Sequence, residues 1–566
     1  MNKYPRHPMT TDRTHVLETA KRPECLDGPI YLDHNATTPV DPRVLEAMLP
    51  YLHTQFGNPS SDHPYASAPK RAVARARAQV AELVGANPDE ITFMGSGSEA
   101  DATAIRGVVA AALTAGVRKP HVITQATEHP AVLAACQYAE RFHGAEVTVV
   151  PVDRDGLVDL DEVASAMRPT TVLLSIMHAN NETGVIQPVR ELAAVAHDHG
   201  ALFHTDAAQT VGKIPVDVTD LGVDLLTLVG HKMYAPKGIA ALYIRNGTRI
   251  EPLIGGGGQE RGLRAGTENV PYIVALGAAA AIAATDLAAG DSDRLTALRD
   301  ELERELVKRL PGRVHLNGHR VRRLPQTLNV SVDGVAGHAI LAACADVAAS
   351  TGSACHSGTH TPSPVLLAMG LSPERALSAL RLTLGRWTTR ADVVLAAEAL
   401  AHASDAPANS ASPRRQRTEH PARPEMASGQ GGAVAGTVAI DVLLEAARQG
   451  LDRVQPADLA AEITAGALIV DIRPIEQRQR DGDMPGALVI DRNVLEWRLD
   501  PTSPNHAPAM TDAGRRVVII CNQGYSSSLA AATLRRLGLR RATDLDGGYQ
   551  AWARYANQHP EGQAHP

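Results

Sequence analysis

The chain has 566 residues, which is too long for a single hydrophobic core and predicts two or more domains. Hydrophobic residues make up 44% and charged residues 21%, the composition of an ordinary globular protein, and the net charge of −7 gives no reason to expect a nucleic-acid partner. The polar N-terminus lacks the apolar core of a signal peptide, and no run of eighteen apolar residues predicts a membrane span. We therefore expect a protein that acts without nucleic acid and without a membrane.

The five cysteines are Cys25, Cys136, Cys344, Cys355 and Cys521. No two of them have the spacing of metal ligands or of a disulfide framework, so we expect free thiols, no bound metal and a reducing, cytoplasmic location. Cys136 and Cys344 lie in helical patterns, where a small core residue is the simpler interpretation. Cys25 lies in the N-terminal leader and is expected to be exposed.

Residues 1–29 form a loose leader, and an even block of sequence follows from 30 to about 403. Its first part, 30–278, alternates helical patterns such as Val189–His199 with short apolar runs bounded by Gly, Pro or Asp. These runs predict seven strands of a mostly parallel α/β sheet covered on both faces. The seven strands are Ile91–Met94, Val122–Gln125, Val147–Val152, Val172–Met177, Leu202–Asp206, Leu225–Val229 and Ala240–Ile244.

The rest of the block, 279–403, predicts a smaller α+β subdomain with a long helix near Leu295–Leu310 and a strand at Thr327–Val332. Residues 404–437 are rich in Ser, Pro, Ala, Arg and Gly and are predicted to form a flexible linker. A second small α/β domain follows at 438–566, with its core at about 451–556. Its apolar runs are Leu468–Ile472 and Val517–Ile520, and a helical pattern covers Ser527–Leu537.

Two reactive groups stand out in the first block. Lys232 follows an apolar strand, and Asp206 ends another strand 26 residues earlier. Both are expected at the carboxyl ends of parallel strands, the edge where open α/β sheets bind ligands. A lysine can hold a carbonyl cofactor as a Schiff base, and an aspartate can keep a pyridine nitrogen protonated. The turn Gly95–Glu99 opens a helical pattern, so its backbone N–H groups form a plausible phosphate cradle.

The second reactive group is Cys355, which lies in the loop Ser350–Pro364. This loop is rich in Ser, Gly, Thr and His and has few apolar anchors. A thiol that accepts sulfur inside a site and delivers it outside needs such mobility. His356 and His360 are placed to lower the pKa of the thiol if their side chains face it.

These features resemble the cysteine desulfurases, pyridoxal phosphate enzymes of fold type I in the class V aminotransferase superfamily, of the kind that supplies iron–sulfur assembly. The resemblance covers residues 31 to about 403. It rests on the segments 31–39 (YLDHNATTP), 58–61 (NPSS), 127–132 (TEHPAV), 180–188 (NNETGVIQP), 204–213 (HTDAAQTVGK), 230–238 (GHKMYAPKG), 256–269 (GGGQERGLRAGTEN), 350–355 (STGSAC) and 380–386 (LRLTLGR).

The resemblance implies a role for each matching residue. Lys232 forms the Schiff base, Asp206 pairs with the pyridine nitrogen, and His129 stacks over the ring and takes part in catalysis. Arg381 binds the substrate carboxylate, a contact that suits a bidentate guanidinium, and Cys355 is the nucleophile. Asn181 and Gln209 are implied at the ring oxygen, with Asn181 also near the substrate. Gly97, Ser98, His231 and, from the neighbouring subunit of a homodimer, Thr267 are implied at the phosphate, and Gly230 is a further cofactor contact.

One position departs from the pattern. Many relatives have a serine two residues before the His231–Lys232 pair, where it donates to the phosphate, and this chain has Val229. The missing hydrogen bond is worth roughly 0.5–1.5 kcal/mol. We expect weaker cofactor retention and an active site.

In the second domain, Cys521 lies between a strand end and a helix start, where N–H groups favour a thiolate. Residues 451–556 resemble a single rhodanese domain through 468–474 (LIVDIRP), 482–487 (GDMPGA), the Cys521 loop and 546–552 (DGGYQAW). Rhodanese domains carry a persulfide on this cysteine. Ser526 replaces a frequent arginine and Asp483 a usual histidine, so thiosulfate is expected to be a poor substrate.

The sequence thus predicts a cysteine desulfurase that converts L-cysteine to L-alanine and leaves a persulfide on Cys355. Relay of the sulfur to Cys521, or to external acceptor proteins for iron–sulfur or thio-cofactor assembly, is the preferred hypothesis. A selenocysteine lyase has the same chemistry, and a persulfide carrier or scaffold dominated by the rhodanese domain is the alternative from another class. The sequence leaves the final acceptor open.

Overall fold

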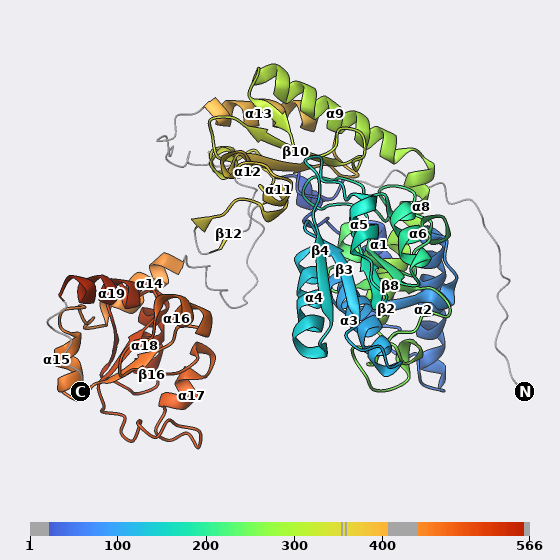
Figure 1. Cartoon of the computed structure of the whole chain (residues 1–566). Coiled ribbons are helices and arrows are strands. Elements are labelled where there is room, and N and C mark those ends of the chain that lie inside the picture. The colour runs from blue at the N-terminus through green and yellow to red at the C-terminus, as the bar shows by residue number, and fades with distance from the viewer. Residues whose placement is uncertain (1–21, 353–354, 357–358, 406–439, 560–566) are drawn as a thin grey trace, which may run out of the picture. The chain divides into compact units, whose positions relative to one another are not determined.

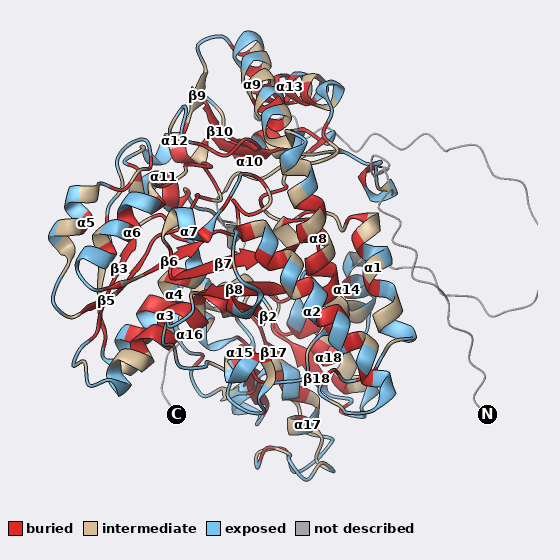
Figure 2. Cartoon of the chain, turned by 90° about the vertical axis from the view of Figure 1, so that its right-hand side faces the viewer, coloured by how far each residue is buried: buried red, intermediate tan, exposed pale blue. Residues whose placement is uncertain are grey.

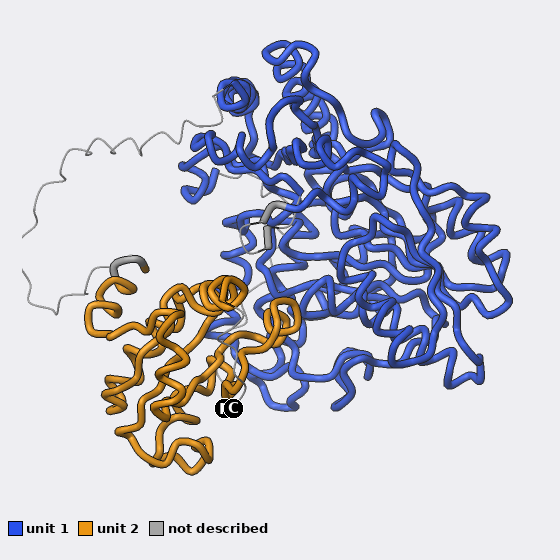
Figure 3. Tube along the Cα trace, turned by 60° about the vertical axis from the view of Figure 1, so that its left-hand side comes forward, with its two compact units in different colours: residues 1–417 blue, residues 418–566 orange. Residues whose placement is uncertain are grey.

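The computed structural model describes residues 22–352, 355–356, 359–405 and 440–559. The chain divides into two compact units, residues 1–417 and 418–566, which Figure 3 colours separately. The first unit contains a large and a small subdomain, and the second is a small α/β domain. This is the predicted fold class.

A seven-stranded sheet forms the centre of the large subdomain (Figure 1). The strand β8 is antiparallel to both of its neighbours, and the other pairs are parallel. The mostly parallel sheet predicted from the apolar runs is therefore confirmed. In spatial order the strands are β2 (Ile91–Met94), β8 (Ala240–Ile244), β7 (Leu225–Val229), β6 (Leu202–Asp206), β5 (Thr171–Ser175), β3 (His121–Gln125) and β4 (Glu146–Val150).

Helices cover both faces of this sheet. Alternate residues of a strand point to opposite faces, and here both sets are apolar. Leu225 belongs to the apolar cluster that contains residues of α3 (Gly97–Thr114) and α4 (Pro130–His143). Its neighbour Leu226 belongs to the cluster on the other face. Figure 2 shows the resulting buried layer along the strands. The remaining helices of this subdomain are α1 (Pro42–His53), α2 (Pro64–Val84), α5 (Leu160–Ala166), α6 (Val189–Asp198), α7 (Val218–Leu221) and α8 (Val270–Ala288).

The helix α8 is long and apolar enough to cross a membrane by length and composition alone. However, 56% of its apolar window is buried inside the protein, and it packs against α1 and α2. Its buried residues, such as Leu276, join the cluster that covers the sheet. These contacts are typical of a core helix.

The small subdomain has an antiparallel sheet in the order β14 (Ala379–Thr383), β10 (Thr327–Val332) and β9 (Val314–Leu316). The strand β1 (Ile30–Tyr31) pairs in parallel with β11 (Val347–Ala348), so the start of the described chain also contributes here. A second two-stranded ladder joins β12 (Cys355–His356) and β13 (Thr359–His360). The helices are α9 (Asp291–Arg309), α10 (Gly337–Ala343), α11 (Pro364–Ala368), α12 (Pro373–Leu377) and α13 (Arg390–Asp405).

The second unit is built on a four-stranded parallel sheet in the order β16 (Leu488–Val489), β15 (Leu468–Asp471), β17 (Val517–Ile520) and β18 (Ala542–Asp544). Val517 and Val518 join different apolar clusters, so both faces of the sheet are covered. The helices are α14 (Ile440–Gln449), α15 (Leu459–Thr464), α16 (Ile475–Asp481), α17 (Leu495–Leu499), α18 (Ser526–Arg536) and α19 (Gly548–Gln558).

Candidate active site

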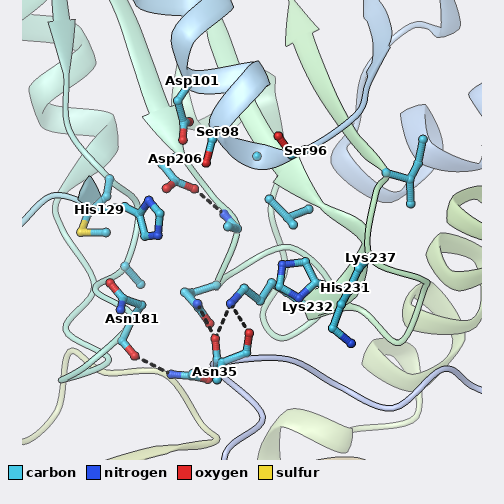
Figure 4. A pocket seen from close by; sticks show the side chains of 18 of the residues that line it. Asn35, Ser96, Ser98, Asp101, His129, Asn181, Asp206, His231, Lys232 and Lys237 are labelled. Atoms are coloured by element: carbon cyan, nitrogen blue, oxygen red, sulfur yellow. Dashed lines mark hydrogen bonds between the residues drawn. The ribbon is translucent and has the colours of Figure 1, made fainter. Parts of the chain in front are cut away.

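A cavity of about 510 Å³ opens at the carboxyl edge of the large sheet. Asp206 at the end of β6 and Lys232 just after β7 both line it, as their positions in the sequence predict. Arg381 of β14 reaches the same cavity from the small subdomain. Figure 4 shows Asp206 and Lys232 on the wall of this cavity. The cavity lies within the range of about 300–1,000 Å³ typical of cofactor and ligand sites.

Lys232 ends a short 3₁₀ turn, Gly230–Lys232, that follows β7 directly. Its Nζ donates to the carbonyl oxygens of Asn35 at 2.5 Å and Ala36 at 2.8 Å. Burial, with a further contribution from Arg381, lowers the pKa of Lys232 to about 8. Close to neutral pH a useful fraction of this amine is therefore uncharged and able to act as a nucleophile or a base.

Asp206 is buried at the other side of the cavity, and its Oδ1 accepts from the backbone N–H of Ala208 at 2.9 Å. Burial raises the pKa of Asp206 above its ordinary value. Asp101 of α3 lies nearby, and burial together with the Asp206 carboxylate raises the pKa of Asp101 well above its ordinary value. A positively charged ring nitrogen beside such a buried carboxyl would lower its pKa and so favour the charged form.

His129 is the N-cap of α4, where its Nδ1 accepts from the backbone N–H of Ala131 at 3.2 Å. Pro130 at the first helical position fixes this turn because its ring pre-sets the helical φ. Burial lowers the pKa of His129. The imidazole is therefore neutral at physiological pH, and its ring lines the cavity (Figure 4).

The N-terminus of α3 forms the end of the cavity farthest from Asn35 in Figure 4. Ser96 caps the helix by accepting from the Glu99 backbone N–H at 3.1 Å, and Glu99 accepts from the Gly95 N–H at 2.8 Å. This reciprocal capping leaves Gly97 and Ser98 on the cavity wall. A helix N-terminus with a glycine is suited to bind a phosphate. The predicted cradle is thus a helix start, as expected.

His231 and Val229 lie beside this helix start. Nδ1 of His231 is 3.1 Å from the Thr37 hydroxyl, and burial lowers the pKa of His231 to about 4, so the ring is neutral. A Cβ atom added to Gly97 would stand 2.6 Å from Cγ2 of Val229. The valine that replaces the expected serine therefore packs directly against the helix start.

Arg381 is buried, with 7% of its surface exposed. Its Nη2 pairs with the Asp33 carboxylate at 2.9 Å, and its Nη1 donates to the backbone carbonyl of Asn181 at 3.4 Å. The guanidinium thus has one buried donor, Nε, without a hydrogen-bond partner among the described residues.

Most of the predicted site residues line this one cavity. Gln209 lines it and donates through Nε2 to the Asn35 carbonyl at 3.1 Å. Gly230 is buried behind the wall, and Thr267 is exposed on the segment before α8. Cys355 lies in β12, but its side chain is outside what the structure describes, so its role stays a prediction.

Sequence reasoning assigned no role to several residues that line the cavity or hold a residue that does. Asn35 supplies the carbonyl that holds Lys232, and Asp33 holds Arg381. Both belong to the segment 31–39 whose letters resemble the family, which was the available signal. Asp101 and Lys237 also line the cavity. Lys237 belongs to the family segment 230–238, whereas Asp101 lies in a helix interior that carries no local sign of a site.

The second unit holds Cys521 between β17 and α18, as predicted. Its Sγ accepts from the Gly524 backbone N–H at 3.1 Å and lies 3.2 Å from the Ser527 hydroxyl. Burial acts to raise the pKa of Cys521, but hydrogen bonds from Ser527, Ser526 and the loop backbone bring it below its ordinary value. Asp483, where a histidine is usual, pairs with Arg478 at 3.2 Å.

The other described cysteines lack this environment. Cys136 and Cys344 are buried, and burial raises the pKa of Cys136 to about 12 and that of Cys344 above its ordinary value. Cys25 is exposed. All three predictions for these thiols are confirmed.

The family model of the class-V aminotransferases matches residues 30–395, which hold the whole cavity. The chain belongs to the class-V aminotransferase family. The model of the rhodanese-like domain matches residues 455–555 in the second unit. Two matches along the chain thus account for both units.

Individual proteins similar to this chain agree with the family. The cysteine desulfurase IscS of Dictyoglomus turgidum is 48% identical over 366 residues, which are 64% of this chain and 91% of that protein. The cysteine desulfurase of Mus musculus is 45% identical over 382 residues, 67% of this chain and 82% of that protein. A solved NifS-like protein superimposes with a TM-score of 0.61 at 36% identity and covers 66% of this chain and 98% of its own.

Members of this family use pyridoxal phosphate, and the cavity residues fit that group. The glycine helix start suits a phosphate, and Asp206, which forms no ion pair among the described residues, suits a positively charged pyridine nitrogen. The amine of Lys232 is held at the same cavity by the backbone carbonyls of Asn35 and Ala36. No part of this donor set conflicts with the cofactor.

Proposed function

We propose that this chain is a pyridoxal phosphate-dependent cysteine desulfurase that converts L-cysteine to L-alanine and keeps the sulfur as a persulfide on Cys355. The observation that carries the proposal is the convergence of Lys232, Asp206, His129 and Arg381 on one cavity at the sheet edge. Relatives named cysteine desulfurase, at 45–48% identity, support it. A persulfide-type Cys521 domain on the same chain supports sulfur transfer as the purpose of the whole protein.

The cofactor supplies, when bound, a carbonyl carbon for the amines and a ring that stores the electron pair released at the substrate. Lys232 would hold the cofactor through its amine, and Asp206 would pair with the ring nitrogen. Gly97 and Ser98 at the α3 start, together with His231, would hold the phosphate by N–H and O–H donors. The remaining contacts are assigned to His129 over the ring and to Asn181, Gln209 and Gly230 around it.

Arg381 binds the substrate carboxylate. Its Nε is a buried donor without a partner, and its Nη2 is held by Asp33. A substrate carboxylate accepts from the Nη groups of Arg381, which keep further N–H donors beyond those used by Asp33 and the Asn181 carbonyl. The interaction fixes the amino acid so that its Cα lies within reach of the Lys232 amine. Lys232, with its lowered pKa, moves the Cα proton.

Cys355 acts on the sulfur of the bound substrate. Its thiolate attacks that sulfur, an S–S bond forms, and the C–S bond breaks with its electron pair passing to the substrate carbon. A proton then completes alanine. A second thiolate can take the outer sulfur of the Cys355 persulfide by direct exchange. The transfer therefore needs no outside oxidant.

The sulfur passes next to Cys521 or to an acceptor protein. The lowered pKa of Cys521 provides a thiolate that attacks the outer sulfur of the Cys355 persulfide. Because both cysteines are on one chain, tethering raises their effective concentration to about the millimolar range. Thiosulfate is a poor donor because Asp483 places a negative charge where a histidine is usual.

The enzyme acts as a homodimer in the cytoplasm. Thr267 is exposed in the single chain, which leaves it available to a neighbouring subunit's phosphate. Among the described residues, the cysteines with defined side chains are free thiols, which suits a reducing compartment; they are Cys25, Cys136, Cys344 and Cys521. The acceptors are proteins that take persulfide sulfur for iron–sulfur or thio-cofactor assembly.

The test compares the Cys355→Ala and Cys25→Ala variants. We expect Cys355→Ala to lose alanine formation from L-cysteine while it keeps the visible absorbance of bound cofactor, and Cys25→Ala, the exposed control, to keep both. The same assay with selenocysteine measures substrate preference. Alanine formation at the wild-type rate in Cys355→Ala would contradict the proposal.

A further inference from the structure

The helix α14 (Ile440–Gln449) follows the linker directly and lies outside the residues 455–555 that the rhodanese-like family model matches. It nevertheless packs against α18, the helix that begins just after the Cys521 loop. Arg448 in its last turn is the residue that reaches that loop. An element from outside the matched domain thus contacts the sulfur-carrying site.

Arg448 makes three contacts with the loop and with α18. Its Nη2 donates to the Gly524 carbonyl at 2.8 Å, and its Nε donates to the Ser528 hydroxyl at 3.2 Å. Its guanidinium carbon lies 5.6 Å from the ring centre of Tyr525, within cation–π distance. The rigid fork of the guanidinium makes these contacts together, which a lysine with its single nitrogen cannot do.

Gly524 is the link between Arg448 and the sulfur. Its backbone N–H donates to Cys521 Sγ at 3.1 Å, and its carbonyl is held by Arg448 from the outer side. Arg453 adds a longer bond to the same carbonyl at 3.3 Å. With φ at +77° Gly524 adopts a left-handed conformation that glycine permits and other residues disfavour. Holding its carbonyl fixes the peptide plane that follows Gly524 and so restrains rotation at its Cα, which helps to keep its N–H directed at Sγ.

Charged groups surround this loop on several elements. Buried Asp544 of β18 accepts from the Ser527 hydroxyl at 3.1 Å and the Ser528 hydroxyl at 2.7 Å, and it pairs with Arg453 at 2.9 Å. Arg453 is thus shared between Asp544, Asp546, with which it pairs at 2.5 Å, and the Gly524 carbonyl. Arg448 has no carboxylate partner among the ion pairs of the described chain, so its charge is directed to the loop carbonyl and the Tyr525 ring.

We propose that Arg448 is a positioning residue that orients the Gly524 N–H toward Cys521 Sγ, so that the helix joined to the linker supports the thiolate, and later the persulfide, of the second domain. The inference rests on the proposed role of Cys521 as a sulfur carrier. The terminal sulfur of a persulfide is an anion, and fixed N–H donors stabilise it as they stabilise the thiolate. The linker side of the domain is thereby part of the sulfur site.

The experiment uses the full chain with Arg448→Ala and Arg448→Lys, and Gln449→Ala as the matched control because Gln449 is an exposed neighbour on the same helix. Alkylation by iodoacetamide is followed at Cys521 by peptide mass spectrometry across a pH series, without L-cysteine. The exposed Cys25 in the same samples calibrates the reagent.

We expect alkylation of Cys521 near neutral pH to fall about tenfold in Arg448→Ala, with the midpoint of its pH profile moved up by about one pH unit. Arg448→Lys should fall between, because it keeps one donor, and Gln449→Ala should match the wild type. If circular dichroism shows that Arg448→Ala unfolds the domain, the pH profile of Cys521 alkylation in Arg448→Lys decides the question. A wild-type profile in the folded Arg448 variants overturns the inference.

Alanine formation from L-cysteine, measured in the same variants, separates this inference from the proposed function. Because Arg448 lies in the second unit, we expect its variants to form alanine at the wild-type rate. An unchanged Cys521 profile with normal alanine formation refutes the positioning role alone. Absence of alanine formation in the wild type refutes the proposed function, whatever the alkylation profile.

Discussion

The contact between Gly97 and Val229 allows a prediction about the helix start that forms the phosphate end of the cavity. In Gly97→Ala the new Cβ would stand 2.6 Å from Cγ2 of Val229, about 1 Å closer than the ordinary separation of about 3.5–4.0 Å. Val229 is β-branched, is 6% exposed and ends a central strand, so it has little room to move. Either the first turn of α3 shifts or the pair stays overpacked.

Overpacking of this kind costs about 1–3 kcal/mol. Alanine gains at most about 1 kcal/mol over glycine in a helix, so with the full gain the free energy of unfolding still falls by up to about 2 kcal/mol. Urea denaturation of the cofactor-free protein measures this loss, and titration with pyridoxal phosphate measures the accompanying change in affinity.

The double variant Gly97→Ala/Val229→Ala supplies the control, because it removes the Cγ2 atom that causes the overlap. We expect Val229→Ala to cost less in the Gly97→Ala background than in the wild type, with an interaction energy of about 1 kcal/mol or more in the double-mutant cycle. Strictly additive effects of the two substitutions would refute the packing argument.

Two further predictions concern the same unit. Val229→Ser should bind pyridoxal phosphate about twofold to tenfold more tightly, because a hydroxyl replaces a methyl beside the helix start and one hydrogen bond is worth about 0.5–1.5 kcal/mol; an unchanged dissociation constant in a fluorescence titration speaks against it. Burial raises the pKa of Glu182 to about 7, and its carboxyl accepts from the Ser363 hydroxyl at 2.6 Å. The stability that the neutral carboxyl contributes is therefore full below about pH 4.5 and is lost as the pH rises to 7. In urea denaturation, the free energy of unfolding of Glu182→Gln should therefore exceed that of the wild type by about 1–3 kcal/mol at pH 8 and differ little at pH 5. An equal gain at both pH values would argue for a cause other than ionisation.

Local patterns predicted much of the fold and of the site because they depend on neighbouring residues. All seven strands of the large sheet followed from apolar runs bounded by Gly, Pro or Asp. The run Val172–Met177 overshot β5, which ends at Ser175, because its last residues leave the ladder although they remain apolar. The Met177 N–H instead donates to the Glu128 carboxylate at 2.6 Å, a contact that no local pattern announces.

Contacts between distant segments were beyond local reasoning. The carbonyl of Asn35 holds Lys232 from 197 residues away, and Asp33 pairs with Arg381 across 348 residues. Neither residue has a pattern of its own that marks it, and only the family segment that contains both suggested importance. Arg448 was likewise unmarked, because its partner is a backbone carbonyl, which every residue possesses.

The most direct test of the whole account is to locate the sulfur after the protein reacts with L-cysteine. Peptide mass spectrometry of the wild-type chain should find one added sulfur atom first on Cys355 and then on Cys521. In Cys355→Ala neither peptide should gain sulfur, and in Cys521→Ser only the Cys355 peptide should. Sulfur on Cys521 in the chain that lacks Cys355, or none on Cys355 in the wild type, would contradict the account.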